Sequence, residues 1–263
     1  MKRIVAVGIV LSASLALAQS VGTTTNGLTA SQKEKLRLEK RGGMITVPPV
    51  GPEIKIIDAR KDVGPAAEIV VSDLQKVIRL NADKMVAEAA DEECPFSLGS
   101  RAVAEGALLA VVIANVGDAK PMLCLAPEER VAVVNAERLG KGVGAVELEK
   151  RLVKEIWRAI GIIGGAGVSP QNLDVMKPVY APSDLDAIRE VRLNAQSLFL
   201  MNGFFRRFSV EQGGEMTYRA AVTLGRAPAP TNDIQRAVWD RVMAAKAAKA
   251  AATNAPSATP PAK

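Results

Sequence analysis

The segment Lys154-Glu155-Ile156-Trp157-Arg158-Ala159-Ile160-Gly161 lies within the most strongly patterned stretch of this sequence. From Val146 to Ile163, apolar side chains recur every three or four residues, which predicts an amphipathic helix with one buried face. Glycines at positions 161, 164, 165 and 167 predict where this helix ends. The segment therefore places two cations and a carboxylate on a single helix.

Four strand patterns precede this helix. Glu53 to Asp58 and Arg130 to Asn135 alternate between apolar and other residues, and each is predicted to be a strand. Ala107 to Ala114 is a continuous apolar run, which is typical of a strand covered on both faces. Pro121 to Ala126 begins with proline and is expected at an edge of the sheet. Together they predict an α/β (α+β) domain with a small mixed sheet.

Helical patterns surround these strands in the sequence. A long helix is predicted from Gly64 to about Ala90, and Cys94-Pro95 is expected to break the chain after it. A turn-rich segment from Ser169 to Pro178 follows the patterned helix. Further helices are predicted from Ser183 to about Met201 and from near Thr231.

Composition excludes several classes of function. Histidine is absent from all 263 residues, so no mechanism can use an imidazole as a metal ligand or as a base at neutral pH. Aromatic residues make up only 3%, too few for a nucleic-acid surface built on base stacking. The net charge of +6 is modest, and no nucleic-acid partner is expected. The 48% of hydrophobic residues is enough for a sizeable core.

The N-terminus has the organisation of a secretory signal peptide. Lys2 and Arg3 form its basic start, and Ile4 to Leu15 is an apolar run too short to span a bilayer comfortably. Ala16 and Ala18 supply the pattern of small residues at a cleavage site. Residues 1–18 are therefore predicted to direct export to the periplasm or out of the cell. The alternative is an uncleaved anchor; after cleavage no transmembrane segment is expected.

The rest of the chain is predicted to have three parts. Residues 19–46 are polar and are expected to form a mobile leader, and residues 47–243 a single globular domain. Residues 244–263 are rich in alanine, lysine and proline. Because proline cannot continue a helix, the end of this tail is expected to be disordered.

Cys94 and Cys124 are the only cysteines. An even number in an exported protein favours a disulfide, and closing the loop between them would contribute about 3–4 kcal/mol. The alternative is two buried thiols that behave as small hydrophobic groups. One pair of thiolates is a poor zinc site without further ligands.

The segment from Lys154 to Gly161, read with this order of strands and helices, resembles the zinc-binding helix of the metzincin peptidases, in their archaemetzincin-like branch. That helix carries H-E-x-x-H-x-x-G and leads to a third zinc ligand; its glutamate takes a proton from the zinc-bound water. Glu155 and Gly161 match the glutamate and the glycine, and Leu173-Asp-Val-Met176 resembles the family's Met-containing turn beneath the metal. The resemblance implies a zincin-like fold over roughly residues 53 to 200.

All three metal ligands of that family are replaced here. Lys154 and Arg158 stand at the two histidine positions, and the third falls on Gly164, which has no side chain. Because both side chains are cations, no metal, no cofactor and no peptidase activity are expected, and the resemblance implies a pseudopeptidase. Two environments stay open: a buried site in which Glu155 or Asp174 neutralises the cations, or a hydrated helix face.

Two main functions remain. The first is a non-catalytic binding or scaffold protein of the cell envelope, with an extended peptide or an envelope protein held along the edge strand near Pro121 to Ala126. The alternative is a carboxylate-dependent enzyme of unknown reaction that uses Glu155 with Asp174 or Glu149. A third hypothesis assigns the contacts to the tails alone.

Arg206-Arg207 is a further basic feature, beside Phe204, Phe205 and Phe208. The pattern indicates an amphipathic packing segment with exposed arginines. A patch for an anionic surface is the alternative interpretation.

Overall fold

The computed structural model describes residues 44–60, 64–87, 94–169, 171 and 174–231, and part of 233–248. Residues 45–263 form one compact unit, and of the other unit, residues 1–44, only Met44 is described. The predicted signal peptide, most of the predicted leader and the end of the predicted tail lie outside the described residues.

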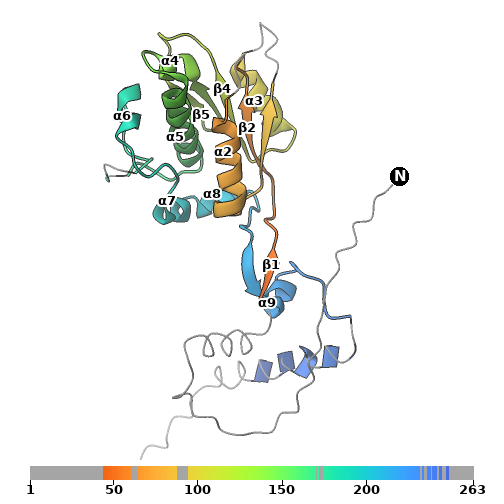
Figure 1. The fold of residues 1–263 in the computed structure, drawn as a ribbon. Coiled ribbons are helices and arrows are strands. Elements are labelled where there is room, and N and C mark those ends of the chain that lie inside the picture. Colours follow the sequence, from red (N-terminus) through yellow and green to blue (C-terminus); the bar gives the residue numbers. More distant parts are fainter. Residues whose placement is uncertain are drawn as a thin grey trace, which may run out of the picture. The chain divides into compact units, whose positions relative to one another are not determined.

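A five-stranded mixed sheet forms the centre of the larger unit (Figure 1). Its order is β3-β2-β4-β6-β5. The first four strands run parallel, and β5 pairs with β6 in the antiparallel direction at one edge. Every residue of β4 and β6 is buried, as expected for central strands. The predicted mixed sheet and its edge strand are confirmed. The bounds are β2 (Ile54–Asp58), β3 (Ala82–Val86), β4 (Leu109–Ala114), β5 (Leu123–Ala126) and β6 (Val131–Asn135).

Helices cover both faces of this sheet. α2 (Ala66–Asp73) and α5 (Ala145–Ile163) contribute to the larger core on one face. α3 (Pro95–Ala104) contributes Leu98 and Ala102 to the smaller core on the other. The short α4 (Ala136–Gly140) begins directly after β6 and leads to α5. The sheet therefore holds α5 on its face through apolar packing.

After α5 the chain forms short elements: α6 (Pro182–Asp186), α7 (Ala195–Leu200) and α8 (Asn202–Arg207). β7 (Gly214–Thr217) then pairs with β1 (Met44–Val47) in a separate two-stranded sheet, and α9 (Tyr218–Thr223) follows. Residues 44–46 therefore lie in a strand, which corrects the leader predicted over 19–46. The described residues between 233 and 248 are mostly helical, near the predicted last helix.

None of the helices in the described part of the chain combines the length and the apolar character that crossing a bilayer requires.

The long helix predicted from Gly64 to about Ala90 is wrong beyond Ile78. α2 passes into a π-helical turn, η2 (Leu74–Ile78), and Arg79 ends it in the left-handed region with a φ of 61°. β3 follows because its residues pair in parallel with β2. Pairing between distant segments has overridden the local helical spacing.

Two other helix predictions also need correction. Cys94-Pro95, expected to break the chain, instead starts α3, because Pro95 takes the first helical position, where a missing N–H costs little. The single helix predicted from Ser183 to Met201 is divided into α6 and α7. Asn194 starts the second of these helices, since its side chain accepts a hydrogen bond from the Ser197 N–H.

The predicted disulfide is not present. Cys94 and Cys124 are free thiols, the first exposed and the second half-buried. Cys94 directly precedes α3, whereas the Cys124 side chain in β5 packs against the smaller core. Cys124 thus behaves as the small hydrophobic group of the alternative interpretation.

Candidate functional site

α5 buries the charged residues of the motif. Glu155 has 0% of its surface exposed, and Lys154 and Arg158 have 8% each. Every residue from Arg151 to Gly161 is buried, because the helix is enclosed by the sheet on one side and by the segments after it on the other. The hydrated helix face, one of the two predicted environments, is therefore wrong.

Arg158 and Glu155 form a buried ion pair within α5. The Arg158 guanidinium donates from Nη1 to Oε2 of Glu155 at 2.7 Å. Burial raises the pKa of Glu155, and the charge and hydrogen bond of Arg158 act in the opposite direction. Oε1 of Glu155 and Nε of Arg158 have no hydrogen-bond partner among the described residues. The pair neutralises its own charge but leaves polar atoms unsatisfied.

Lys154 is held by a backbone carbonyl. Its Nζ donates to the carbonyl oxygen of Leu185 in α6 at 2.8 Å, and the same oxygen accepts the Ile188 N–H. Burial lowers the pKa of Lys154, and the nearby charges of Asp186 and Glu147 oppose this effect. In the described part of the chain, neither Glu155 nor Asp174 accepts a hydrogen bond from this ammonium. The neutralising carboxylate predicted for Lys154 is thus not in direct contact with it.

Arg151, which the sequence reasoning missed, anchors α6 to α5. Its guanidinium donates to both carboxylate oxygens of Asp186, at 2.8 and 2.6 Å, and to the Leu139 carbonyl at 2.8 Å. The hydrogen bond from Arg151 lowers the pKa of Asp186. The sequence does contain a signal for Arg151: it lies three positions before Lys154, and residues so spaced on a helix are neighbours on its surface. This clamp positions the Leu185 carbonyl that receives Lys154.

Glu149, a predicted acid–base candidate, uses both of its carboxylate oxygens in hydrogen bonds to other elements of the fold. Its Oε1 accepts from Nη1 of Arg60 at 2.8 Å, and its Oε2 accepts the Ala66 N–H at 2.9 Å in the first turn of α2. Arg60 is also bound to both oxygens of Asp58, at the end of β2. Glu149 therefore ties α5 to the start of α2 and the end of β2.

Asp174, the other candidate acid, organises the Met-containing turn. It is fully buried, and its Oδ1 accepts the Met176 N–H at 2.9 Å. Its Oδ2 accepts from Nδ2 of Asn194 at 2.6 Å. Both oxygens thus hold the turn against the segment that begins α7. Leu173, quoted for the resemblance, lies outside the described residues.

Met176 packs directly against the motif helix. A Cβ added to Gly161 would lie 2.5 Å from Sδ of Met176 and 2.8 Å from Cδ2 of Leu193. The close approach needs glycine, because a real Cβ does not come this near to another side chain. The structure therefore brings Gly161 and Met176 together, as the resemblance implies.

Gly164, at the position of the third ligand, is also closely packed. A Cβ there would lie 2.2 Å from Cε of Met201. Gly164 is the C-terminal cap of α5, with a φ of −73°. The place that a ligand side chain would need is filled by Met201.

The residues at the three ligand positions do not fit zinc. Lys154 and Arg158 are cations that present N–H donors and no lone pair, and Gly164 has no side-chain atom that could bind a metal. Across the described ranges, no cluster of three or more His, Cys, Asp or Glu residues is placed to bind a metal ion.

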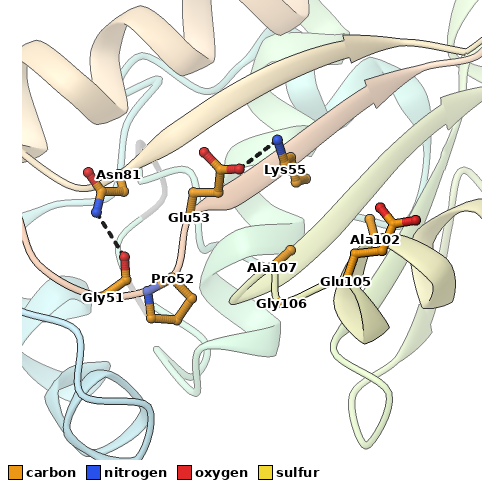
Figure 2. Close-up of a pocket in the computed structure, with 9 residues that line it drawn as sticks. All are labelled: Gly51, Pro52, Glu53, Lys55, Asn81, Ala102, Glu105, Gly106 and Ala107. Atoms are coloured by element: carbon orange, nitrogen blue, oxygen red, sulfur yellow. Dashed lines mark hydrogen bonds and ion pairs between the residues drawn. The ribbon is translucent and has the colours of Figure 1, made fainter. Parts of the chain in front are cut away.

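A cavity of about 420 Å³ lies away from the motif helix, near the starts of β2 and β3 (Figure 2). Lys55 on its wall pairs with Glu53 and with Asp83, each at 2.6 Å, and Asn81 donates to the Gly51 carbonyl. The side chains of Lys55 and Asn81 are thus both bonded to neighbouring residues. No predicted site residue lines this cavity.

Three solved structures are similar in fold to this chain. Archaemetzincin from Methanopyrus kandleri is 14% identical, with 60% of this chain and 97% of that chain covered and a TM-score of 0.45. A zinc-dependent peptidase from Methanocorpusculum labreanum is 16% identical, with coverages of 57% and 100% and a TM-score of 0.44. Archaemetzincin from Archaeoglobus fulgidus, complexed with malonate, is 18% identical, with coverages of 56% and 98% and a TM-score of 0.39.

Two of these structures are archaemetzincins, the family whose zinc-binding helix the segment from Lys154 to Gly161 resembles. At such identities the likeness concerns the fold and not the chemistry. Neither a family model nor a curated protein matches the sequence.

Proposed function

We propose that this protein is a non-catalytic binding protein built on a peptidase-like fold. One observation carries the proposal: both side chains at the histidine positions of the motif are N–H donors, and each makes a buried hydrogen bond within the protein, Lys154 to Leu185 and Arg158 to Glu155. A hydrolytic site needs a base that reaches a water molecule, and Glu155 has no exposed surface.

The ligand that we propose is an extended peptide or the extended segment of an envelope protein. β5 (Leu123–Ala126) is an edge strand, and all four of its residues are half-buried. Leu123 and Leu125 pack toward the larger core, while Cys124 packs toward the smaller one. Such a strand offers backbone groups on its outer edge to an added strand and requires no metal.

The carboxylate-dependent enzyme is the weaker hypothesis. Its three acids are engaged separately: Glu155 with Arg158, Asp174 with Asn194 and Met176, and Glu149 with Arg60 and Ala66. Paired catalytic carboxylates have to share one environment and reach a substrate. No hydrogen bond joins any two of the three in the described residues.

Two measurements on the purified protein test the absence of catalysis. We expect less than stoichiometric zinc by elemental analysis and no cleavage of a mixed peptide substrate when zinc is added. Stoichiometric zinc, or cleavage that a chelator abolishes, would refute the non-catalytic proposal.

Hydrogen exchange tests the edge strand. The protein is incubated with a library of extended peptides, and exchange is followed by mass spectrometry. Bound peptide is expected to slow exchange over 122–126 and to leave 82–86, in the opposite edge strand, unchanged. Peptide binding with protection elsewhere, or no binding above background, counts against this edge as the binding site.

Export is a separate part of the proposal. It rests on the predicted signal peptide over residues 1–18, and N-terminal sequencing of the protein from its own cells tests it. A mature chain that begins at Gln19 in the periplasmic or secreted fraction is expected. An intact Met1 in the cytoplasmic fraction would contradict it.

A further inference from the structure

α7 and α8 are two six-residue helices that follow each other directly in the chain, with Met201 between them (Figure 1). Met201 joins them, accepting the Phe205 N–H and donating its own N–H to Ser197. The buried residues are Ser197, Met201 and Phe205, spaced by four. The spacing leaves the opposite side of both helices facing solvent.

The exposed side combines large apolar groups with cations. Phe199 is 71% exposed and Leu200 51% exposed. Arg206 and Arg207, about two turns further along, are exposed as well. The period of burial continues through Met201, so both pairs lie on the exposed side of their helices, and Asn202 and Gly203 between them are exposed as well. We call this the α7–α8 face.

The segment that forms this face contains no acidic side chain to neutralise its arginines. From Val191 to Val210 the sequence has three arginines and no Asp or Glu. Arg192 approaches Asp73 at 3.5 Å. Arg207 lies over the ring of Phe208, with 5.4 Å from its Cζ to the ring centroid. Among the described residues, Arg206 and Arg207 form no ion pair with a carboxylate.

We propose that the α7–α8 face binds the surface of an anionic lipid bilayer. Phe199 and Leu200 enter the boundary between headgroups and acyl chains, while Arg206 and Arg207 contact lipid phosphates. An exposed apolar pair beside unneutralised arginines is the pattern of a helix that lies in the plane of a membrane interface. The proposal does not depend on the function proposed for the motif helix or for β5.

Charge favours a lipid surface over a second copy of the chain. A symmetric dimer would place the same face against itself and bring Arg206 and Arg207 of both copies together. Like charges so juxtaposed oppose association. An anionic bilayer supplies the opposite charge over the whole face and also an apolar layer for the two large side chains.

Vesicle flotation of the full chain tests the proposal, with vesicles of phosphatidylcholine alone and of phosphatidylcholine with phosphatidylglycerol. The readout is the difference in bound protein between the two vesicles, compared across variants of the same chain. Arg206→Gln/Arg207→Gln is expected to lower binding to the anionic vesicles about 20-fold, since each arginine near such a surface contributes about fivefold. Phe199→Ser/Leu200→Ser is expected to lower it about tenfold.

The control variants remove exposed side chains of the same character, apolar or cationic, elsewhere on the surface. Val146→Ser removes an exposed apolar side chain of α5, and Lys141→Gln/Lys150→Gln removes two exposed cations. Both are expected to bind like the unchanged protein. Phe199→Trp keeps an aromatic group, and its fluorescence is expected to shift to the blue and to be quenched by brominated phosphatidylglycerol.

Three results would overturn the proposal. One is no preference for anionic vesicles, and another is an equal loss of binding in the control variants. The third is self-association that Phe199→Ser/Leu200→Ser abolishes in sedimentation velocity, which would assign the face to a second copy.

Discussion

Arg158 lies one turn after Glu155 on α5 and donates to it at 2.7 Å, and Glu155 has no exposed surface at all. Each residue supplies the opposite charge that the other needs in an environment with little water. A buried ion pair of this kind does little for stability compared with apolar residues, but losing one partner is costly because the other charge stays buried.

Arg158→Met is therefore expected to lower the free energy of unfolding by about 3 kcal/mol near neutral pH. Urea denaturation followed by circular dichroism measures the change. Glu155→Gln/Arg158→Met removes both charges and is expected to recover a large part of the loss. A single variant that loses less than about 0.5 kcal/mol would show that the pair is effectively solvated.

The pH dependence of stability reports on Glu155. Burial raises its pKa above the ordinary value of 4.5. A carboxyl group that binds its proton more tightly when folded contributes stability that is complete below the unfolded pKa and is lost as pH rises through the folded pKa. Relative to Glu155→Gln, the unchanged protein is therefore expected to lose unfolding free energy as the pH rises above about 4.5. Denaturation curves at several pH values test this; parallel pH profiles for the two proteins would disprove it.

Gly161→Ala tests the contact between the motif helix and the Met-containing turn. The new Cβ would lie 2.5 Å from Met176 Sδ, so Met176 or the helix has to move. We expect a loss of about 1–3 kcal/mol, as in other overpacked cores. Gly203→Ala is the matched control, because Gly203 is also helical and a Cβ there meets nothing within 4 Å. The control is expected to be neutral or stabilising, and equal effects in both variants would contradict the packing argument.

Asn194→Asp tests how Asp174 holds the turn. Nδ2 of Asn194 donates to Asp174 at 2.6 Å, so the substitution replaces a donor with a second carboxylate. We expect a loss of about 2–4 kcal/mol at pH 7 and a smaller loss at acidic pH, where one of the two carboxyl groups takes up a proton. Thermal unfolding at both pH values measures it, with Asn194→Ala as the control that adds no charge and removes both the hydrogen bond to Asp174 and the cap of α7. A loss that does not depend on pH would argue against a direct contact.

Local patterns were sufficient for the central elements of the fold. The apolar run before Ala114 and the periodicity of α5 each lie within one segment, and burial follows from them directly. β3 was missed because its identity depends on pairing with β2, and only Arg79 in left-handed backbone marks the end of the preceding helix. α3 was missed because Pro95 begins a helix as readily as it interrupts a chain.

The sequence was sufficient to predict which residues form the candidate site, but not which residues they contact. The motif spacing identified Lys154, Glu155 and Arg158. The partner of Lys154 is a carbonyl 31 residues away, and Arg151 reaches Asp186 across 35 residues. Such contacts depend on where α6 packs, which no local pattern in the sequence encodes.

The direction of the strands also has a consequence for how the chain folds. β5 and β6 are joined by a four-residue loop, whereas the parallel pairs can form only after long crossovers have closed. Forming the β5–β6 hairpin therefore costs the least chain entropy, and we expect the sheet to nucleate there. β4 can then pair with β6. Truncation of Val133 in β6 is accordingly expected to slow refolding, while truncation of Ile54 in β2 mainly accelerates unfolding. The reverse pattern would place the nucleus at the opposite side of the sheet.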